Sequence, residues 1–308
     1  GMAVHVFKYW RYPLDADTVS KLDHIGLMSY DISGAFSSKV FGTSPLCADV
    51  DVDANNAQVN DKRYSIIGGL GEWKRALMTT GVIPDKDGNE HSCPQPGAGI
   101  TVEETAKKKL VVGVGAYTRF MNIGSSTNRA DDVAVGTTVK SGTTATSLWD
   151  WSKNVPVNTC DRYDGAQAVY TERPKCYGPR SYAPGFEAWY GISGDTINTR
   201  IGTEGTPVMS KDTTSFVGPR SDWKHRLCTD ADGANSGRLS YAYSVFKCPA
   251  EYYHNGDNSA DVAARTTDAN NRLWFASFDD EASMSEKGDF IAAEGYGGAM
   301  IWAYNLDT

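Results

Sequence analysis

The sequence predicts an α/β fold in which parallel strands alternate with helices. Residues 109–115, Lys-Leu-Val-Val-Gly-Val-Gly, form the short apolar run that is typical of a buried strand. Residues 68–80 place apolar side chains at helical spacing on one side. Residues 299–303, Ala-Met-Ile-Trp-Ala, follow glycines and show the pattern of a strand covered on both faces. Together these segments indicate a parallel sheet packed against helices.

The other elements of the first 119 residues agree with this alternation. In chain order we expect a strand within 4–10, a short helix at 18–23, a strand at 24–30, and polar loops at 37–65 and 84–103. The order strand, helix, strand is that of a parallel α/β unit. Functional groups in such folds gather at the carboxyl ends of the strands.

Residues 120–272 interrupt the pattern. They contain short Tyr- and Thr-rich segments between clusters of Gly, Pro, Asn and Asp, together with four of the six cysteines. We expect an α+β or β-rich insertion here, after which residues 273–308 resume the helix and strand. The predicted organisation is therefore 1–119, 120–272 and 273–308. Such an insertion normally lies at one face of the sheet, beside the site.

Composition excludes several classes of protein. The chain has 308 residues and a formal net charge of −8, which argues against nucleic acid as its main partner. No apolar run approaches the ~20 residues that a membrane helix needs. An acidic chain rich in aromatic residues and glycine suits a neutral polymer such as a glycan.

The cysteines bear on metal binding and on compartment. None of them forms a Cys-x-x-Cys pair, so we predict no zinc site, and no other cofactor. An even number in a loop-rich chain favours disulfides and a secreted protein. Free thiols in the core of a cytosolic protein are the alternative. The six positions are Cys47, Cys93, Cys160, Cys176, Cys228 and Cys248.

Three places could carry chemistry. Tyr30 and Asp31 lie at the carboxyl end of a predicted strand. A hydroxyl and a carboxylate at that end are suited to binding a substrate. The alternative is an Asp that caps the loop beside a Tyr of the core. Tyr117 and Arg119 leave the next strand and should share one face, either at the site or with the Arg stem packed on an aromatic ring. Trp302 is either a sugar platform or a core residue.

Three segments resemble one family, in the right order. Residues 22–36 resemble the sixth-strand segment of glycoside hydrolase family 18 chitinases, especially the bacterial chitinase A type. Residues 109–119 resemble the seventh, with Thr118 in place of a usual Gly, and residues 278–302 resemble the last helix and the eighth strand. The resemblance implies the C-terminal part of a (β/α)8 TIM barrel, about strands six to eight, with a large α+β insertion after strand seven.

The resemblance also implies an activity and roles. The family hydrolyses β-1,4-linked N-acetylglucosamine polymers by a substrate-assisted retaining mechanism, in which the acetamido group attacks and a glutamic acid protonates the leaving oxygen. Tyr30 would hold the acetamido group, and Asp31 would contact the sugar or tune the acid. The implied substrate-binding residues are Met28, Phe36, Tyr117, Arg119 and Trp302.

The family's catalytic signature, Asp-x-x-Asp-x-Asp-x-Glu before strand six, is missing from the sequence. The acidic run that begins at Asp49 follows strand six and has Asn55 where the Glu would stand. We therefore expect barrel strands one to four, most of strand five and the acid to be absent from this sequence. It is then a piece of a longer chitinase, a chain completed by a second polypeptide, or a non-catalytic, lectin-like chitin-binding protein whose insertion covers the open side.

Overall fold

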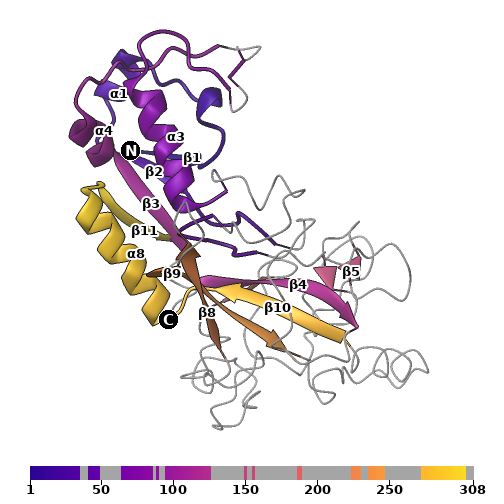
Figure 1. Ribbon diagram of the computed structural model, residues 1–308. Coiled ribbons are helices and arrows are strands. Elements are labelled where there is room, and N and C mark those ends of the chain that lie inside the picture. The colour runs from indigo at the N-terminus through magenta and orange to yellow at the C-terminus, as the bar shows by residue number, and fades with distance from the viewer. Residues whose placement is uncertain are drawn as a thin grey trace, which may run out of the picture.

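The computed structural model describes residues 1–34, 41–48, 64–85, 88–89, 94–125, 149–150, 155–156, 186–188, 223–229, 235–246 and 272–302. These residues form two larger sheets, one parallel and one antiparallel, and a short two-stranded one. In Figure 1 the carboxyl end of β3 runs directly into the antiparallel sheet.

The parallel sheet confirms the predicted α/β fold. Its four strands are β1 (Met2–His5), β2 (Ile25–Met28), β3 (Leu110–Gly115) and β11 (Gly298–Trp302), in the order β1-β2-β3-β11. Every neighbouring pair is parallel. The first strand begins two residues before the predicted range 4–10 and ends at His5, because the chain then turns toward the 3-10 helix η1 (Tyr9–Arg11).

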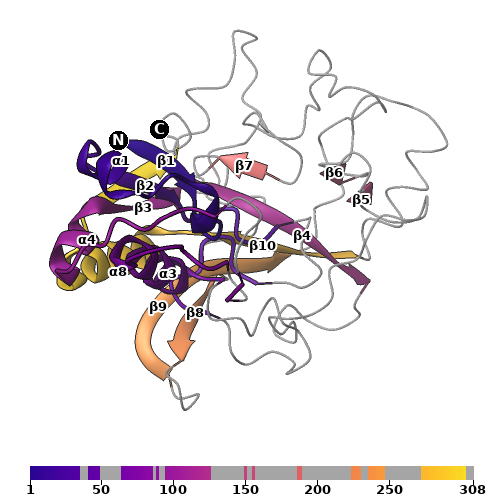
Figure 2. The ribbon, with the colours of Figure 1, turned by 90° about the horizontal axis from the view of Figure 1, so that it is seen from above.

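Helices cover one face of this sheet. They are α1 (Ala16–Ser20), α3 (Ile66–Met78), α4 (Glu103–Lys109) and α8 (Glu281–Glu294), and Figure 2 shows α3 and α8 on the same side of the strands. Leu110 and Val112 of β3 share a buried cluster with Trp73 of α3. The indole N–H of Trp73 donates to the Val6 carbonyl at 2.8 Å. The helix predicted at 68–80 is thus confirmed, but it begins and ends two residues earlier than predicted.

Side-chain caps define where the two longest helices begin. Ser65 accepts a hydrogen bond from the amide of Gly68 at the start of α3. Asp280 accepts one from the amide of Ser283, whose hydroxyl accepts from the Asp280 amide in return, so α8 begins with a reciprocal capping box. The α8 helix ends at Glu294 and is capped by Gly295, whose φ of 73° is in the left-handed region.

The antiparallel sheet comes mostly from residues 120–272, which the sequence predicts to be an insertion. Its strands are β4 (Tyr117–Ser125), β7 (Phe186–Ala188), β8 (Lys224–Thr229), β9 (Asn235–Phe246) and β10 (Arg272–Phe278), in the order β7-β4-β10-β9-β8. The sheet begins at Tyr117, which only Ala116 separates from β3. Its last strand in chain order, β10, ends shortly before α8. The expected boundaries at 119/120 and 272/273 therefore fall within β4 and β10.

One expectation about the last strand is wrong. Residues 299–303 have the pattern of a strand covered on both faces, yet Ile301 is 52% exposed and Trp302 57% exposed. The reason is position: β11 is an edge strand, which pairs with β3 on one side. Apolar composition indicates a strand here, but it does not distinguish an edge from a centre.

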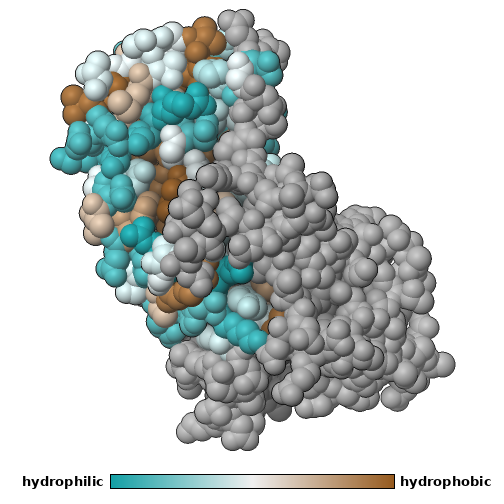
Figure 3. Space-filling model, in the orientation of Figure 1, coloured by the Kyte–Doolittle hydropathy of each residue, from teal (hydrophilic) through white to brown (hydrophobic). Residues whose placement is uncertain are grey.

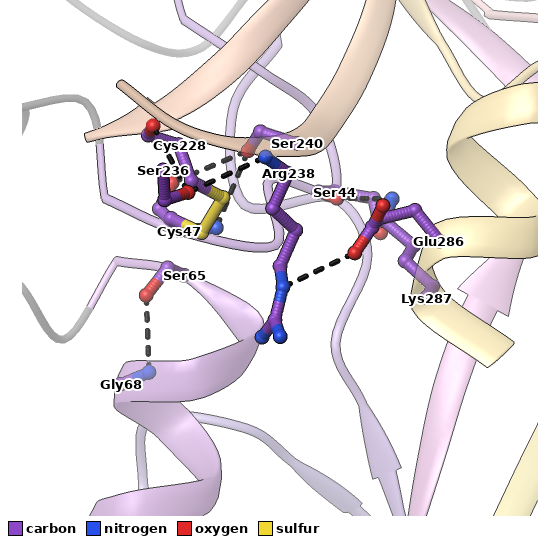
Figure 4. Close-up of a disulfide and its surroundings, with 10 residues drawn as sticks. All are labelled: Ser44, Cys47, Ser65, Gly68, Cys228, Ser236, Arg238, Ser240, Glu286 and Lys287. Atoms are coloured by element: carbon purple, nitrogen blue, oxygen red, sulfur yellow. Dashed lines mark hydrogen bonds and ion pairs between the residues drawn. A yellow bond between two sulfur atoms is a disulfide. The ribbon is translucent and has the colours of Figure 1, made fainter. Parts of the chain in front are cut away.

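The loop after β2 joins the two sheets. Cys47 in this loop forms a disulfide with Cys228 of β8, as Figure 4 shows. The amide of Leu46 donates to the Ser240 carbonyl of β9 at 3.2 Å, and Ser240 Oγ accepts from the Cys47 amide at the same distance. The expectation of disulfides is confirmed for this pair, and the other four cysteines lie outside the described residues.

We expect the Cys47→Ala/Cys228→Ala double variant to unfold more easily. The bond joins positions 181 residues apart, so its loss frees the unfolded chain and should cost about 2–5 kcal/mol. Denaturant titration of both proteins measures the difference. Ser236→Ala is the control, because the Ser236 hydroxyl lies near the same bond and donates to the Cys228 carbonyl at 3.3 Å. This variant should change stability far less. Equal midpoints for the double variant and the parent would contradict this expectation.

On the face drawn in Figure 3, hydrophilic residues cover most of the described part, and hydrophobic residues surface in patches between them. In the described ranges, the large apolar side chains that are exposed are those of Ile67, Val82, Val102, Ile301 and Trp302. Among the residues that the structure describes, no helix combines the length and the apolar character needed to cross a bilayer.

Candidate functional site

The site forms where β2 ends. Met28 is the last residue of the strand, and Tyr30 and Asp31 follow in an irregular segment that leads into bends at residues 32–34 and is called here the Tyr30–Asp31 turn. Asp31 has a φ of 56° and is the one non-glycine residue with positive φ among the described residues. Asp tolerates the left-handed region better than most side chains, but the conformation still costs energy, so surrounding contacts must hold the turn.

The Asp31 carboxylate collects two donors from the strand that follows β3. The hydroxyl of Tyr117 donates to Asp31 Oδ1 at 2.7 Å. The Nε–H of Arg119 donates to the same oxygen at 2.8 Å. Both residues therefore share one face of β4, as strand alternation predicts. A carboxylate fixed by a phenol and a guanidinium is held in one orientation at the carboxyl ends of β2 and β3.

Burial and charge both act on these groups. The Asp31 side chain is 36% exposed, whereas that of Arg119 is only 15% exposed. Burial alone lowers the pKa of Arg119, but its hydrogen bond to Asp31 and the charge of that carboxylate raise it, and the net shift is upward. Burial followed by the Asp31 charge raises the pKa of Tyr117 and of Tyr30. Both phenols thus keep their protons at neutral pH.

Glycines in β3 make room for the two tyrosine rings. A Cβ on Gly113 would lie 3.0 Å from Tyr30 Cε1, and one on Gly115 would lie 2.6 Å from Tyr117 Cε1. The two rings meet edge to face with centroids 6.1 Å apart. The Leu-Val-Val-Gly-Val-Gly segment thus packs its larger side chains on the helices and leaves its other face open for the aromatic residues.

Trp302 lies on the same face of the sheet. Met300 approaches the Cβ positions of Gly26 and Gly113, on the side where Tyr30 also lies. Alternate residues of a strand share a face, so Trp302, two residues on, projects to that side. It pairs in register with Gly115, and its carbonyl accepts from the Ala116 amide at 2.9 Å.

The predicted residues have different outcomes in the structure. The structure brings together Tyr30, Asp31, Tyr117 and Arg119. Met28 is half-buried at the end of β2 and lies on the same face of that strand as Gly26. Phe36 lies outside the described residues. Within the described ranges, no group of three or more His, Cys, Asp or Glu side chains could hold a metal ion.

Sequence reasoning missed the buried polar residues beneath the site. Ser29 and Ser44 are fully or almost fully buried, and so is the Asp279–Lys287 ion pair. One signal was available for Lys287. Its spacing of four residues from Ser283, and of three and four residues from Phe290 and Ile291, places it on the buried side of α8.

Comparison with known families decides where the chain belongs. The family model described as "Glycosyl hydrolases family 18" matches residues 3–307. The chain belongs to glycosyl hydrolase family 18. Membership confirms the resemblance at the level of the family and implies a TIM-barrel fold.

Several solved structures similar to this family 18 chain are chitinases. They include catalytic domain 2 of the Ostrinia furnacalis Group II chitinase, at 18% identity and TM-score 0.44, over 99% of this chain and 48% of that one. A Rhizomucor miehei chitinase has 16% identity and TM-score 0.46, over 99% and 57%. The chain spans about half the length of these proteins, and the family match carries the assignment. The comparison with curated proteins found no match.

Proposed function

We propose that this chain is the substrate-binding, C-terminal part of a chitinase-like glycoside hydrolase that acts on β-1,4-linked N-acetylglucosamine polymers. Family membership supports the carbohydrate class. The observation that carries the proposal is the convergence of Tyr117 and Arg119 on Asp31, next to Tyr30 and on the side of the sheet to which Trp302 projects. In this proposal β2, β3 and β11 are barrel strands six, seven and eight.

Each side chain has a role that its chemistry suits. The neutral Tyr30 hydroxyl hydrogen-bonds the acetamido group and holds its carbonyl oxygen for attack, which is a positioning effect. Asp31 contacts the sugar or tunes the acid, and Tyr117 and Arg119 fix that carboxylate. Trp302 presents its ring to the apolar face of a sugar. Met28 lines the site. The resemblance assigns Phe36, which lies outside the described residues, to stacking on a sugar.

Hydrolysis in this scheme needs a glutamic acid from outside the sequence, because the 308 residues lack the Asp-x-x-Asp-x-Asp-x-Glu signature. The expected result is that the chain alone does not turn over a chromogenic chitobioside. A sample with an intact family 18 chitinase serves as the positive control. Turnover by the chain alone would show that one of its own groups supplies the acid.

The alternative function is glycan binding without cleavage, as in a lectin-like protein. The exposed side chain of Trp302 favours glycan binding in both functions, with or without cleavage. If the chain binds chito-oligosaccharides, Trp302→Ala should weaken the affinity by about 2 kcal/mol, or roughly thirtyfold in Kd, in titration calorimetry. Ile301→Ala is the matched control, since Ile301 is equally exposed on the opposite face of β11. No binding by the unaltered chain would contradict both functions.

We also propose a secreted location, supported by the Cys47–Cys228 disulfide. A second polypeptide that supplies further barrel strands is the remaining proposed partner, because β1 and β11 are the two edges of the parallel sheet. The mass of the native particle tests this directly. A particle with the mass of one chain of 33.4 kDa would contradict the two-polypeptide proposal.

A further inference from the structure

A buried ion pair is linked to the site through Ser44. Lys287 of α8 is 1% exposed and donates from Nζ to both carboxylate oxygens of Asp279 and to the backbone carbonyl of Ser44, each at 2.5 Å. Figure 4 shows its side chain pointing from α8 to Ser44. The hydroxyl of Ser283 also donates to Asp279 Oδ1, at 2.9 Å. The lysine thus uses all three of its donors on two partners.

A chain of hydrogen bonds leads from this pair to the Tyr30–Asp31 turn. Ser44 is held by Lys287 through its carbonyl, and its hydroxyl donates to the carbonyl of Ser29 at 2.9 Å. The Ser29 hydroxyl donates in turn to the Gly113 carbonyl at 2.7 Å. Ser29 directly precedes Tyr30, so its position fixes where the turn starts.

The far side of the turn rests on the same short segment. The amide of Ile32 donates to the Thr43 carbonyl at 2.8 Å, and the Thr43 hydroxyl donates to the Ser33 carbonyl at 2.8 Å. The Thr43 amide is itself bound to Ser277 Oγ of β10, at 2.8 Å. Residues 43–44 therefore brace Asp31 from both sides, and α8 and β10 hold the brace.

Stability alone is a poor reason for this arrangement. Burial raises the pKa of Asp279 and lowers the pKa of Lys287, since both charges are removed from water. Well-packed apolar residues often replace a buried ion pair without loss of stability. An apolar pair could not, however, donate to the Ser44 carbonyl. That contact ties the ion pair to the turn.

We infer that Lys287 and Asp279 are positioning residues, which hold Ser44 and through it the Tyr30–Asp31 turn in the geometry that binds the sugar. The inference rests on the proposed function for its effect on ligand, but not for its effect on the turn. Asp279 orients the ammonium group, and Lys287 makes the contact to Ser44.

The test compares two variants with the parent protein. Lys287→Met removes the donor and leaves Asp279 buried, so it should lose both stability and the braced turn. The double variant Lys287→Met/Asp279→Leu removes both charges and should recover stability, while the Ser44 contact stays absent. Ser283 keeps a partner in the double variant, because its hydroxyl also accepts from the Asp280 amide.

Two readouts separate positioning from stability. Amide exchange in a peptide covering Ser29–Ser33 should become about tenfold faster in the double variant, with a peptide from α3 unchanged. Affinity for a chito-oligosaccharide should fall about tenfold in the double variant. The Cys47→Ala/Cys228→Ala protein is the control for lost stability, and it should keep its affinity.

The outcomes are distinct. Unchanged exchange at Ser29–Ser33 in a stable double variant would overturn the inference, whether or not the chain binds sugar. Faster exchange with unchanged affinity would overturn the claimed link between the turn and the ligand. If the parent binds no chito-oligosaccharide, the proposed function fails, and the exchange measurement alone decides whether Lys287 positions the turn.

Discussion

Replacing Asp31 with alanine is expected to destabilise the protein by about 3 kcal/mol and to abolish binding at the proposed site. The change removes the oxygen that accepts from both Tyr117 and Arg119, and hydrogen bonds to a charged group contribute about 1.5–3 kcal/mol. It also leaves an alanine at a φ of 56°, which adds about 1–2 kcal/mol of backbone cost.

Two further substitutions at position 31 divide this loss into its parts. Asp31→Gly relieves the backbone but supplies no acceptor, so it should be about 1 kcal/mol more stable than Asp31→Ala. Asp31→Asn tolerates the left-handed conformation and keeps an acceptor oxygen, so it should lose only about 1 kcal/mol relative to the parent.

Denaturant titration of the three variants gives the ranking, and calorimetry with a chito-oligosaccharide gives the affinities. Asp17→Asn is the control, because that carboxylate is 77% exposed and pairs with Lys21 at the surface. An Asp31→Ala protein as stable as the parent would show that the Tyr117 and Arg119 contacts do not hold the turn.

The sequence predicted the elements near the site because their signals are local. The run at 109–115 and the helical spacing at 68–80 need only their own residues to be interpreted. The meeting of Tyr117 and Arg119 on one face followed from strand alternation. Their shared acceptor, Asp31, lies 86 and 88 residues away, and the sequence predicted for them only contact with the substrate or packing of the Arg stem on an aromatic ring.

What the sequence did not predict depends on distant pairing. Whether β11 is covered depends on which strands flank it, and five apolar residues look alike at an edge and at a centre. The contact from Lys287 to Ser44 joins residues 243 positions apart. A lysine in the buried stripe of α8 hints at a buried partner, but only the fold shows that the partner also braces the site.

Replacing Gly113 with alanine is the second change with a large expected effect, at least about 3 kcal/mol. A Cβ there would meet the backbone carbonyl of Leu27, which cannot move without separating β2 from β3. The same Cβ would lie 3.0 Å from both Met300 Cε and Tyr30 Cε1. Overpacking against side chains alone costs about 1–3 kcal/mol, and a rigid backbone contact raises that figure.

The control substitutions have the opposite sign, which makes the test sharp. Gly71 in α3 and Gly288 in α8 have open space where a Cβ would stand, and alanine favours a helix by about 0.5–1 kcal/mol. Thermal or denaturant unfolding should therefore show both helical variants slightly more stable than the parent and Gly113→Ala far less stable. Since Tyr30 packs against Gly113, the affinity for chito-oligosaccharide should fall in this variant alone. A Gly113→Ala protein with parental stability and affinity would contradict the close approach of β2, β3 and the Tyr30 ring on which the proposed site depends.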